Sequence, residues 1–183
     1  MPVKAQGFTL LEMLMAMAIG SLLMLGAART LPQLQVQNLR LMMQAQLHED
    51  MQQIMHTLEK AVRRAGYCHG NCRDTEQGGM HISAGCLLVR WDENSNGRWE
   101  APGREDSEVY GYRLRGSSLE MQRGVTDCQG NGWERLNDPR RVGIRAFQVV
   151  KSGRQIKVSL SGFAQREPGI ARDLEHWLTA ENL

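Results

Sequence analysis

The segment Gly7-Phe8-Thr9-Leu10-Leu11-Glu12 indicates more about the fold than any other part of the sequence. It opens an apolar run of 21 residues that extends from Phe8 to Ala28, and a short polar leader, Met1 to Gln6, precedes it. A helix of that length reaches roughly 31 Å, which is enough to cross the hydrocarbon core of a bilayer. The sequence therefore predicts a leader over residues 1–7 and a transmembrane helix over residues 8–28.

One carboxylate, Glu12, lies inside this apolar run. A charge at the centre of a membrane helix costs on the order of 2.5–3.5 kcal/mol, so Glu12 requires a partner. If the chain is cut after Gly7, the new amine of Phe8 carries the opposite charge nearby. Geometry disfavours full pairing within one helix, so we expect no partner in the same chain and a contact with a neighbouring subunit's amine. The alternative is a charge that snorkels from the helix end to the membrane surface.

The same segment can also be interpreted as an ordinary secretory signal peptide. Lys4 supplies a positive start, and Gly26-Ala27-Ala28 supplies a cleavage site of small residues. However, the apolar run is longer than a usual signal core, and Glu12 has no role in a signal peptide. We therefore favour the membrane helix.

The segment from Gly7 to Glu12, followed by an apolar helix, resembles the processing site of type IV prepilins and type II secretion pseudopilins. In that family a membrane peptidase cuts after the glycine and methylates the new N-terminal phenylalanine. The resemblance implies that Gly7 is the cleavage residue, Phe8 the methylated terminus and Glu12 the subunit-docking carboxylate. Two further segments, Arg64-Ala65-Gly66-Tyr67-Cys68-His69-Gly70 and Trp91-Asp92-Glu93-Asn94-Ser95-Asn96-Gly97, resemble one group of minor pilins in this family.

The resemblance implies a minor pilin, not an enzyme, that helps to initiate or cap a type IV pilus through helix packing and subunit contacts. Its expected partners are other minor pilins, the major pilin, prepilin peptidase, the inner-membrane assembly platform and inner membrane lipid. The expected location is the inner membrane, with a single span and a periplasmic C-terminal head, and the pilus tip or base after assembly. The alternatives are a minor pseudopilin of type II secretion and a pilus-tip adhesin or DNA-binding subunit.

The charge balance argues against a general polyanion-binding role. The net charge is +2 at pH 7, from 22 Lys and Arg against 20 Asp and Glu. A basic cluster consists of Arg135, Arg140, Arg141 and Arg145. Acidic residues are interleaved with it and aromatic stacking partners are sparse, so we expect a solvated face and no DNA partner. No nucleophile elbow, P-loop or metalloprotease motif occurs, so the sequence nominates no catalytic residue.

Beyond the apolar run the sequence predicts an amphipathic continuation of the helix over residues 29–66. Pro32 should kink or locally loosen this helix. Apolar residues then recur at steps of three or four, at Leu39, Met43, Leu47, Met51, Ile54, Leu58, Ala61 and Ala65. This spacing is typical of one helix face, which we expect to pack on a sheet. Gly66 is the predicted helix stop.

After Gly66 the pattern changes to short strands and turns, which predicts a β-rich head over residues 67–183. The predicted strands are Cys86–Trp91, a hairpin of Val109–Leu114 with Leu119–Gln122, and a hairpin of Ala146–Val150 with Gln155–Leu160. The tail, Asp173–Leu178, fits a strand or a short helix, and we favour a strand. The predicted fold is α+β and type IV pilin-like: a long N-terminal helix, partly transmembrane, packed on an antiparallel sheet.

Four cysteines in an exported head suggest two disulfides with three possible connectivities. We favour Cys68–Cys72 together with Cys86–Cys128, because the first pair closes a tight loop of turn-tolerant residues. The rival interpretation is a zinc site, since His69 sits between two thiols. No second cluster of zinc spacing follows, so we favour the disulfides.

The segment Asp92-x-Asn94-x-Asn96-Gly97 resembles the first half of an EF-hand calcium loop. Alternating oxygen donors precede a glycine for the sharp turn, and the backbone carbonyl of Arg98 would follow at the seventh place. The twelfth place is Gly103 rather than a glutamate, so Glu105 or Asp106 would have to reach in.

Calcium is the only cofactor that this loop suggests. Just one ligand of its first half, Asp92, is an ionised carboxylate. We therefore expect weak Ca²⁺ binding, with a dissociation constant on the order of 10⁻⁴ to 10⁻³ M. The alternative is an Asx-rich turn that binds nothing, because Asn and Asp favour turns for their own reasons.

Overall fold

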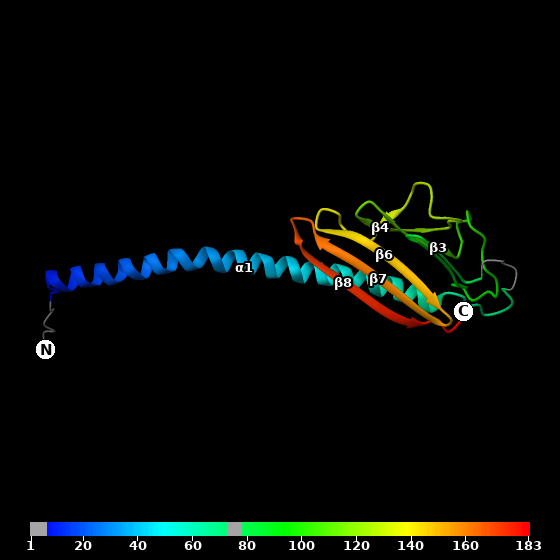
Figure 1. Cartoon of the computed structure of the whole chain (residues 1–183), viewed down its shortest axis with the longest axis horizontal. Helices are drawn as coiled ribbons and strands as arrows, with labels where there is room; N and C mark the ends of the chain where they lie inside the picture. The colour runs from blue at the N-terminus through cyan, green and yellow to red at the C-terminus, as the bar shows by residue number, and fades with distance from the viewer. Residues whose placement is uncertain (1–6, 73–77) are drawn as a thin grey trace, which may run out of the picture. The chain divides into compact units, whose positions relative to one another are not determined.

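The computed structural model of the chain describes residues 7–72 and 78–183, so residues 1–6 of the expected leader lie outside the described residues. The chain divides into two compact units, Met1–Met42 and Met43–Leu183. One helix, α1 (Leu10–Arg64), contributes to both units. All strands of the described residues belong to the second unit (Figure 1). The predicted α+β, pilin-like layout of a long N-terminal apolar helix and antiparallel sheets is confirmed.

In the first unit, α1 has the length and composition needed to cross a membrane. An 18-residue window of the helix has a mean hydropathy of 2.0, and none of that window is buried. Large apolar side chains such as Leu10, Leu22 and Met24 are more than two-thirds exposed. Pro32 does not end the helix, because the loss of one backbone hydrogen bond leaves the neighbouring turns in place.

In the second unit, α1 supplies much of the hydrophobic core. Its buried residues are Leu47, Met51, Ile54, Met55, Leu58, Ala61 and Val62. The predicted stripe therefore packs from Leu47 onward, whereas Leu39 is 59 % exposed. Met55 and Val62 widen the buried face beyond one stripe, since the core joins α1 to strands of two sheets instead of one.

The helix ends as predicted, just before Gly66. This glycine has a φ of +84°, a backbone conformation that other residues rarely adopt. Its N–H donates to the carbonyl oxygen of Arg90 at 2.8 Å, which ties the helix end to a strand. A Cβ here would lie 2.4 Å from the carbonyl oxygen of Asn182, so the close approach also requires glycine.

The first sheet is antiparallel and has five strands in sequence order. They are β1 (Met80–Ser83), β2 (Cys86–Arg90), β3 (Val109–Arg115), β4 (Ser118–Arg123) and β5 (Glu134–Arg135). The predicted β3–β4 hairpin is confirmed, with Arg115 paired to Ser118 across a two-residue turn. Sequence reasoning missed β1 and β5, because strands of four and two residues carry too little alternation to be recognised.

The second sheet is antiparallel and has three strands, β6 (Val142–Ser152), β7 (Gln155–Ala164) and β8 (Glu167–Thr179). The second predicted hairpin is confirmed, with Ser152 paired to Gln155. The tail is a strand, as favoured, and at 13 residues it is longer than the predicted segment. It extends because it pairs along the whole of β7, from Gln155 opposite Thr179 to Ala164 opposite Glu167.

The two sheets are joined by the buried side chain of Asn137, which is 5 % exposed. Its Oδ1 accepts the N–H of Leu119 in β4 at 2.8 Å. Its Nδ2 donates to the carbonyl oxygens of Val142 in β6 at 2.7 Å and of Ser117 at 3.1 Å. One amide thus satisfies three backbone groups from both sides of the sheet boundary.

Candidate functional site

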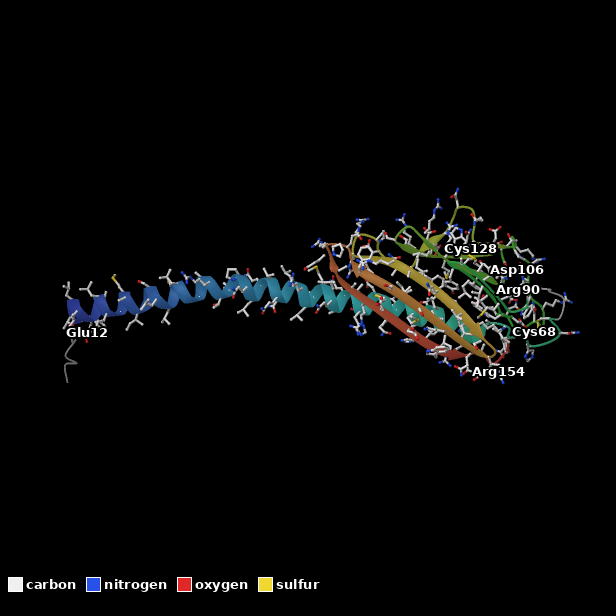
Figure 2. All side chains as sticks on the ribbon, in the orientation of Figure 1. Glu12, Cys68, Arg90, Asp106, Cys128 and Arg154 are labelled. Atoms are coloured by element: carbon white, nitrogen blue, oxygen red, sulfur yellow. A yellow bond between two sulfur atoms is a disulfide. The ribbon has the colours of Figure 1, made fainter. Side chains whose placement is uncertain are left out.

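The start of α1 is a capping box made by Thr9 and Glu12. The N–H and the Oγ1 of Thr9 each donate to Oε2 of Glu12 at 2.9 Å, and the N–H of Glu12 donates to Oγ1 of Thr9 at 3.3 Å. Figure 2 labels Glu12 at this end of the helix. These donors are neutral, so the expected pairing of the Glu12 charge with an amine of a neighbouring subunit stays a prediction. The first N–H groups of a helix have no partner within it, and a carboxylate three residues along can reach back to them.

Gly7 and Phe8 precede the first helical residue and are both exposed, Phe8 by 83 %. A Cβ added to Gly7 would meet no atom of the described chain within 4 Å. The bond between Gly7 and Phe8 therefore lies in open, non-helical backbone next to the capping box. This arrangement gives an external protein access to the bond.

All four cysteines form disulfides. Cys68 is joined to Cys72 with a Cα–Cα distance of 6.1 Å, and Cys86 is joined to Cys128 with a distance of 5.9 Å. These are the two pairs that the sequence favoured. The Cys68 and Cys72 sulfurs lie near Asp92, but sulfurs in a disulfide are not thiolate ligands for zinc.

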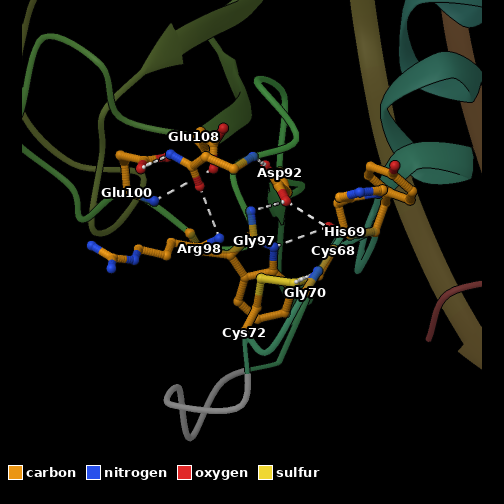
Figure 3. Close-up of a disulfide and its surroundings, with 12 residues drawn as sticks. Cys68, His69, Gly70, Cys72, Asp92, Gly97, Arg98, Glu100 and Glu108 are labelled. Carbon is orange, nitrogen blue, oxygen red and sulfur yellow. Dashed lines mark hydrogen bonds between the residues drawn. A yellow bond between two sulfur atoms is a disulfide. The ribbon is translucent and has the colours of Figure 1, made fainter.

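The predicted calcium loop is built around Asp92, which is 1 % exposed (Figure 3). Its Oδ2 accepts the N–H groups of His69 at 3.0 Å and Gly97 at 2.9 Å, and its Oδ1 accepts the N–H of Asn96 at 3.0 Å. Burial raises the pKa of the Asp92 carboxyl, but these N–H donors outweigh burial and hold the pKa below its ordinary value of 3.8. Asp92 is therefore a buried anion at neutral pH.

The two asparagines shape the loop that follows. Oδ1 of Asn94 accepts the N–H of Asn96 at 2.9 Å, and Oδ1 of Asn96 accepts the N–H of Arg98 at 2.9 Å. Ser95 and Gly97 have φ values of 56° and 81°, so the chain turns sharply between the asparagines and after them. The alternating oxygens of the motif consequently line one tight loop.

Two carboxylates that sequence reasoning did not nominate, Glu100 and Glu108, lie at this loop. Glu108 is 1 % exposed, and its Oε1 accepts the N–H groups of Glu93 at 2.7 Å and Asn94 at 3.3 Å. Glu100 stands at the ninth place of the motif, and its Oε1 accepts Nδ2 of Asn96 at 2.8 Å. Glu100 could have been found from sequence, because it stands at the ninth place of the calcium-loop motif that begins at Asp92. Glu108 lies beyond the twelfth and last place of that motif, so the motif does not indicate it.

The two glutamates are electrostatically linked. Burial, together with the neighbouring Glu100 side chain, raises the pKa of Glu108 above its ordinary value. The hydrogen bond from Asn96 lowers the pKa of Glu100. The side-chain hydrogen bond between the two carboxyls also lowers the pKa of Glu100, so a protonated Glu108 beside an ionised Glu100 is the favoured arrangement.

The residues proposed to complete the loop from sequence lie elsewhere in the turn. Glu105 and Asp106 are both exposed. The Asp106 carboxylate is held by the guanidinium of Arg104, with hydrogen bonds of 2.8 and 3.0 Å that lower the Asp106 pKa. Arg98, whose carbonyl was expected to point inward, is also exposed as a side chain.

The four clustered arginines are separated by the fold. Arg135 lies in β5, while Arg140 and Arg141 help to line a cavity of about 350 Å³ with Asp138 and Leu47 of α1. Arg145 donates to the carbonyl oxygen of Pro168 at 2.9 Å, and its guanidinium lies 4.5 Å from the ring centre of Phe163. The cluster is not a continuous stripe of free cations.

Comparisons with known proteins agree with the N-terminal and head features. A family model described as prepilin peptidase-dependent protein B matches residues 40–180, and a model of the prokaryotic N-terminal methylation motif matches residues 3–28. The chain is 41 % identical over 189 residues to prepilin peptidase-dependent protein B of Escherichia coli (strain K12), with all of both chains covered. No solved structure matches the chain.

Proposed function

The chain belongs to the prepilin peptidase-dependent protein B family of pilin-like proteins, and on that premise we propose that it is a minor pilin that helps to initiate or cap a type IV pilus. In this proposal prepilin peptidase cuts after Gly7 and the new terminus at Phe8 is methylated. The observation that carries it is the exposed Gly7–Phe8 bond in front of a capped apolar helix, within the residues that match the methylation motif.

The proposed location is the inner membrane, with one span near residues 8–28 and the disulfide-containing head in the periplasm. The apolar window of α1 supports the span. Two disulfides support an oxidising compartment for the head, since cytosolic proteins rarely keep such bonds.

Helix packing is the proposed mode of assembly. Apolar side chains remain exposed on α1 beyond the expected span, with Leu31 at 58 %, Leu34 at 54 % and Met42 at 60 %. Apolar surface of this extent, outside both the membrane and the core, is typical of contact with another protein. Sister minor pilins, the major pilin and the assembly platform are the proposed partners.

Glu12 is proposed to dock the chain onto a neighbouring subunit. Its two accepted hydrogen bonds come from neutral donors of Thr9, so the carboxylate keeps its full negative charge. In a low-dielectric membrane that charge attracts the N-terminal amine of another pilin. Capping and docking are therefore separate roles of the same side chain.

The first test addresses processing. Gly7→Val places a branched side chain beside the cut bond, so we expect the protein to retain its leader, while Gly20→Val, an equally open position in the same apolar run, is expected to be cleaved normally. Mass spectrometry of the membrane-bound proteins distinguishes the two forms. A mature chain that begins at Phe8 in Gly7→Val, or wild-type cleavage after Ala28, would contradict the proposal.

The second test addresses docking. Glu12→Gln removes the charge but keeps an oxygen that can cap the helix, because glutamine also serves in capping boxes. We expect normal cleavage and membrane residence, but weaker association with sister pilins and fewer pili. The exposed Glu49→Gln on the same helix is the matched control. The measurements are co-immunoprecipitation from membranes and pilus counts by electron microscopy. If Glu12→Gln behaves like wild type in both, Glu12 is not a docking residue. A defect in secretion with normal pili would favour a pseudopilin of type II secretion.

A further inference from the structure

Three arginines meet at one cavity of the head, although they come from two separate turns. Arg140 and Arg141, from the turn before β6, and Arg166, from the turn between β7 and β8, line the cavity of about 350 Å³. All of its lining residues belong to the second unit. The N–H of Gln165 donates to the carbonyl oxygen of Arg141 at 2.9 Å and so holds the two turns together. The fold therefore gathers these cations from distant parts of the sequence.

The three guanidinium groups are not neutralised within residues 7–72 and 78–183. Their side chains are exposed and form no ion pair or side-chain hydrogen bond with another residue of those ranges. Asp138 is the only carboxylate among the lining residues, and its Oδ1 already accepts the backbone N–H of Arg140 at 3.0 Å. By contrast, Arg113, Arg123 and Arg145 of the same head each donate to a protein carbonyl oxygen. The cavity therefore has an excess of positive charge that is free to bind an anion.

The most deeply buried lining residues of this cavity are apolar. Leu47 of α1, Val142 of β6 and Ala164 of β7 line it, and each is at most 3 % exposed. Arginine binds a carboxylate through two parallel N–H groups, and buried apolar side chains bind an apolar group. A concave site that combines both selects a ligand with an anionic part and an apolar part.

The size and charge of the cavity favour an acidic peptide over an anionic lipid surface. Recognition of a lipid surface depends on clusters of four to eight Lys and Arg, whereas this cavity has three arginines and one acidic residue, Asp138. Its volume lies near the lower end of the range for ligand pockets, which suits a pair of side chains. The Asp138 carboxylate also opposes a ligand with several negative charges. A single carboxylate beside an apolar side chain fits these limits.

We propose that the cavity lined by Arg140, Arg141 and Arg166 binds an acidic segment of a sister pilin, in which an Asp or Glu lies next to an apolar residue. The carboxylate accepts N–H groups of the arginines, and the apolar side chain packs on Leu47 and Val142. This inference rests on the proposed function, because it names a surface by which the head contacts another subunit. It adds a positively charged contact in the head to the negatively charged contact proposed for Glu12.

The experiment uses the full-length chain in membranes of cells that assemble the pilus. A photo-crosslinking amino acid, p-benzoylphenylalanine, replaces Gln46, an exposed residue that lines the cavity. Mass spectrometry of the joined peptides should identify a sister pilin captured at or beside an Asp or Glu. The yield should fall in about 0.5 M NaCl, because salt screens exposed charges. The same amino acid at Gln148, an exposed position of β6, is the positional control and should not capture that segment.

Variants of the arginines test whether charge holds the segment. Arg141→Gln and Arg166→Gln should each lower the crosslink yield about three- to fivefold, as expected for the loss of one exposed ion pair. Both together with Arg140→Gln should lower it at least about tenfold. The matched control is Lys151→Gln, which removes an exposed positive charge elsewhere on β6 and should leave the yield unchanged. All of these variants should melt like wild type.

A charge swap gives the sharpest result. Arg141→Glu should abolish the crosslink, and replacing the captured acidic residue of the sister pilin by Arg should restore it. The proposal is wrong if Gln46 captures only lipid or no sister pilin, if the yield does not depend on the arginines and on salt, or if the swap restores nothing.

These outcomes are distinguishable from a failure of the proposed function. If the chain is cut after Gly7 and Glu12→Gln reduces pili, but the arginine variants keep the crosslink, only the inference about the cavity fails. If wild-type chain is not cut after Gly7, the minor-pilin proposal fails whatever the cavity binds.

Discussion

Single side chains decide how the parts of this head are held together, and Asn137 is the clearest case. Its amide makes three hydrogen bonds to backbone groups of Leu119, Ser117 and Val142, and the residue itself is only 5 % exposed. Without Asn137 the buried N–H of Leu119 would lose this partner, whereas the carbonyl oxygen of Ser117 would keep the N–H of Ile144 at 2.9 Å. The Asn137 side chain therefore supplies hydrogen bonds to backbone groups that, inside a sheet, would come from a neighbouring strand.

Replacing Asn137 should therefore destabilise the head markedly. We expect Asn137→Ala to lower the free energy of unfolding by about 1–3 kcal/mol, the usual cost of leaving buried polar groups unsatisfied. The exposed Asn131→Ala should change it by less than about 0.5 kcal/mol. Denaturant unfolding followed by Trp fluorescence measures both, and equal effects of the two variants would contradict the role of Asn137.

Residues were predictable from sequence where a local motif fixes them. Asp92, Asn94 and Asn96 follow from their spacing, and Gly66 follows from the end of the helical pattern. Glu108 and Asn137 did not follow, because each acts on a segment distant in sequence and nothing nearby marks it. Thr9 was overlooked as the partner of Glu12, although the Thr-x-x-Glu spacing is itself the signal of a capping box.

Two elements, α1 and β8, meet through a side-chain cluster centred on Glu59. Nδ1 of His176 in β8 forms a short hydrogen bond with Oε1 of Glu59, and Nδ1 of His56 lies 3.7 Å from Oε2. The His176 hydrogen bond is the main reason that the pKa of Glu59 lies below its ordinary value of 4.5, with smaller contributions from His56 and Arg63. The ionised form of Glu59 is thus favoured by folding.

This contact should make stability depend on pH in the acidic range. Because the folded-state pKa of Glu59 is lowered, its contribution is complete above pH 4.5 and is lost as the pH falls through the folded value. Glu59→Gln should therefore melt lower than wild type near pH 6, and the difference should shrink toward pH 3. Thermal melts across that range, with Glu49→Gln as control, provide the check; parallel pH profiles for wild type and Glu59→Gln would refute it.

Elements were predictable in proportion to their length and periodicity. The long apolar run and the apolar stripe from Leu47 onward predicted α1, and the two Gly-containing turns predicted the two hairpins. The division into two sheets was not predicted, because it depends on which strands pair with one another and not on any single strand's own pattern. The short strands β1 and β5 exist only as additions to the edges of a sheet that is already formed.

Over the whole molecule, the two disulfides constrain very different lengths of chain. Cys86 and Cys128 are 42 residues apart, and their bond fixes the start of β2 to the segment after β4. Cys68 and Cys72 are only 4 residues apart. In the chain-entropy account, a longer closed loop removes more freedom from the unfolded state.

Removal of the two disulfides should therefore have unequal effects. Converting both Cys86 and Cys128 to Ala should cost about 4 kcal/mol, and converting both Cys68 and Cys72 about 2 kcal/mol, from loop length alone. Denaturant unfolding of the oxidised double variants in chelator separates this effect from any bound ion. A larger loss for the Cys68–Cys72 variant would show that the short bridge acts through the folded loop rather than through chain entropy.

The burial of α1 in the head also has a mechanical consequence. From Leu47 to Val62 the helix is fixed in the core over on the order of 23 Å. Tension applied along the helix from its N-terminal side must slide these side chains past both sheets together, since every core contact resists in parallel. A pull across the helix would instead open the contacts one after another. The head is thus built to bear load in shear, so a force that extracts this helix must rupture the hydrophobic core as a whole.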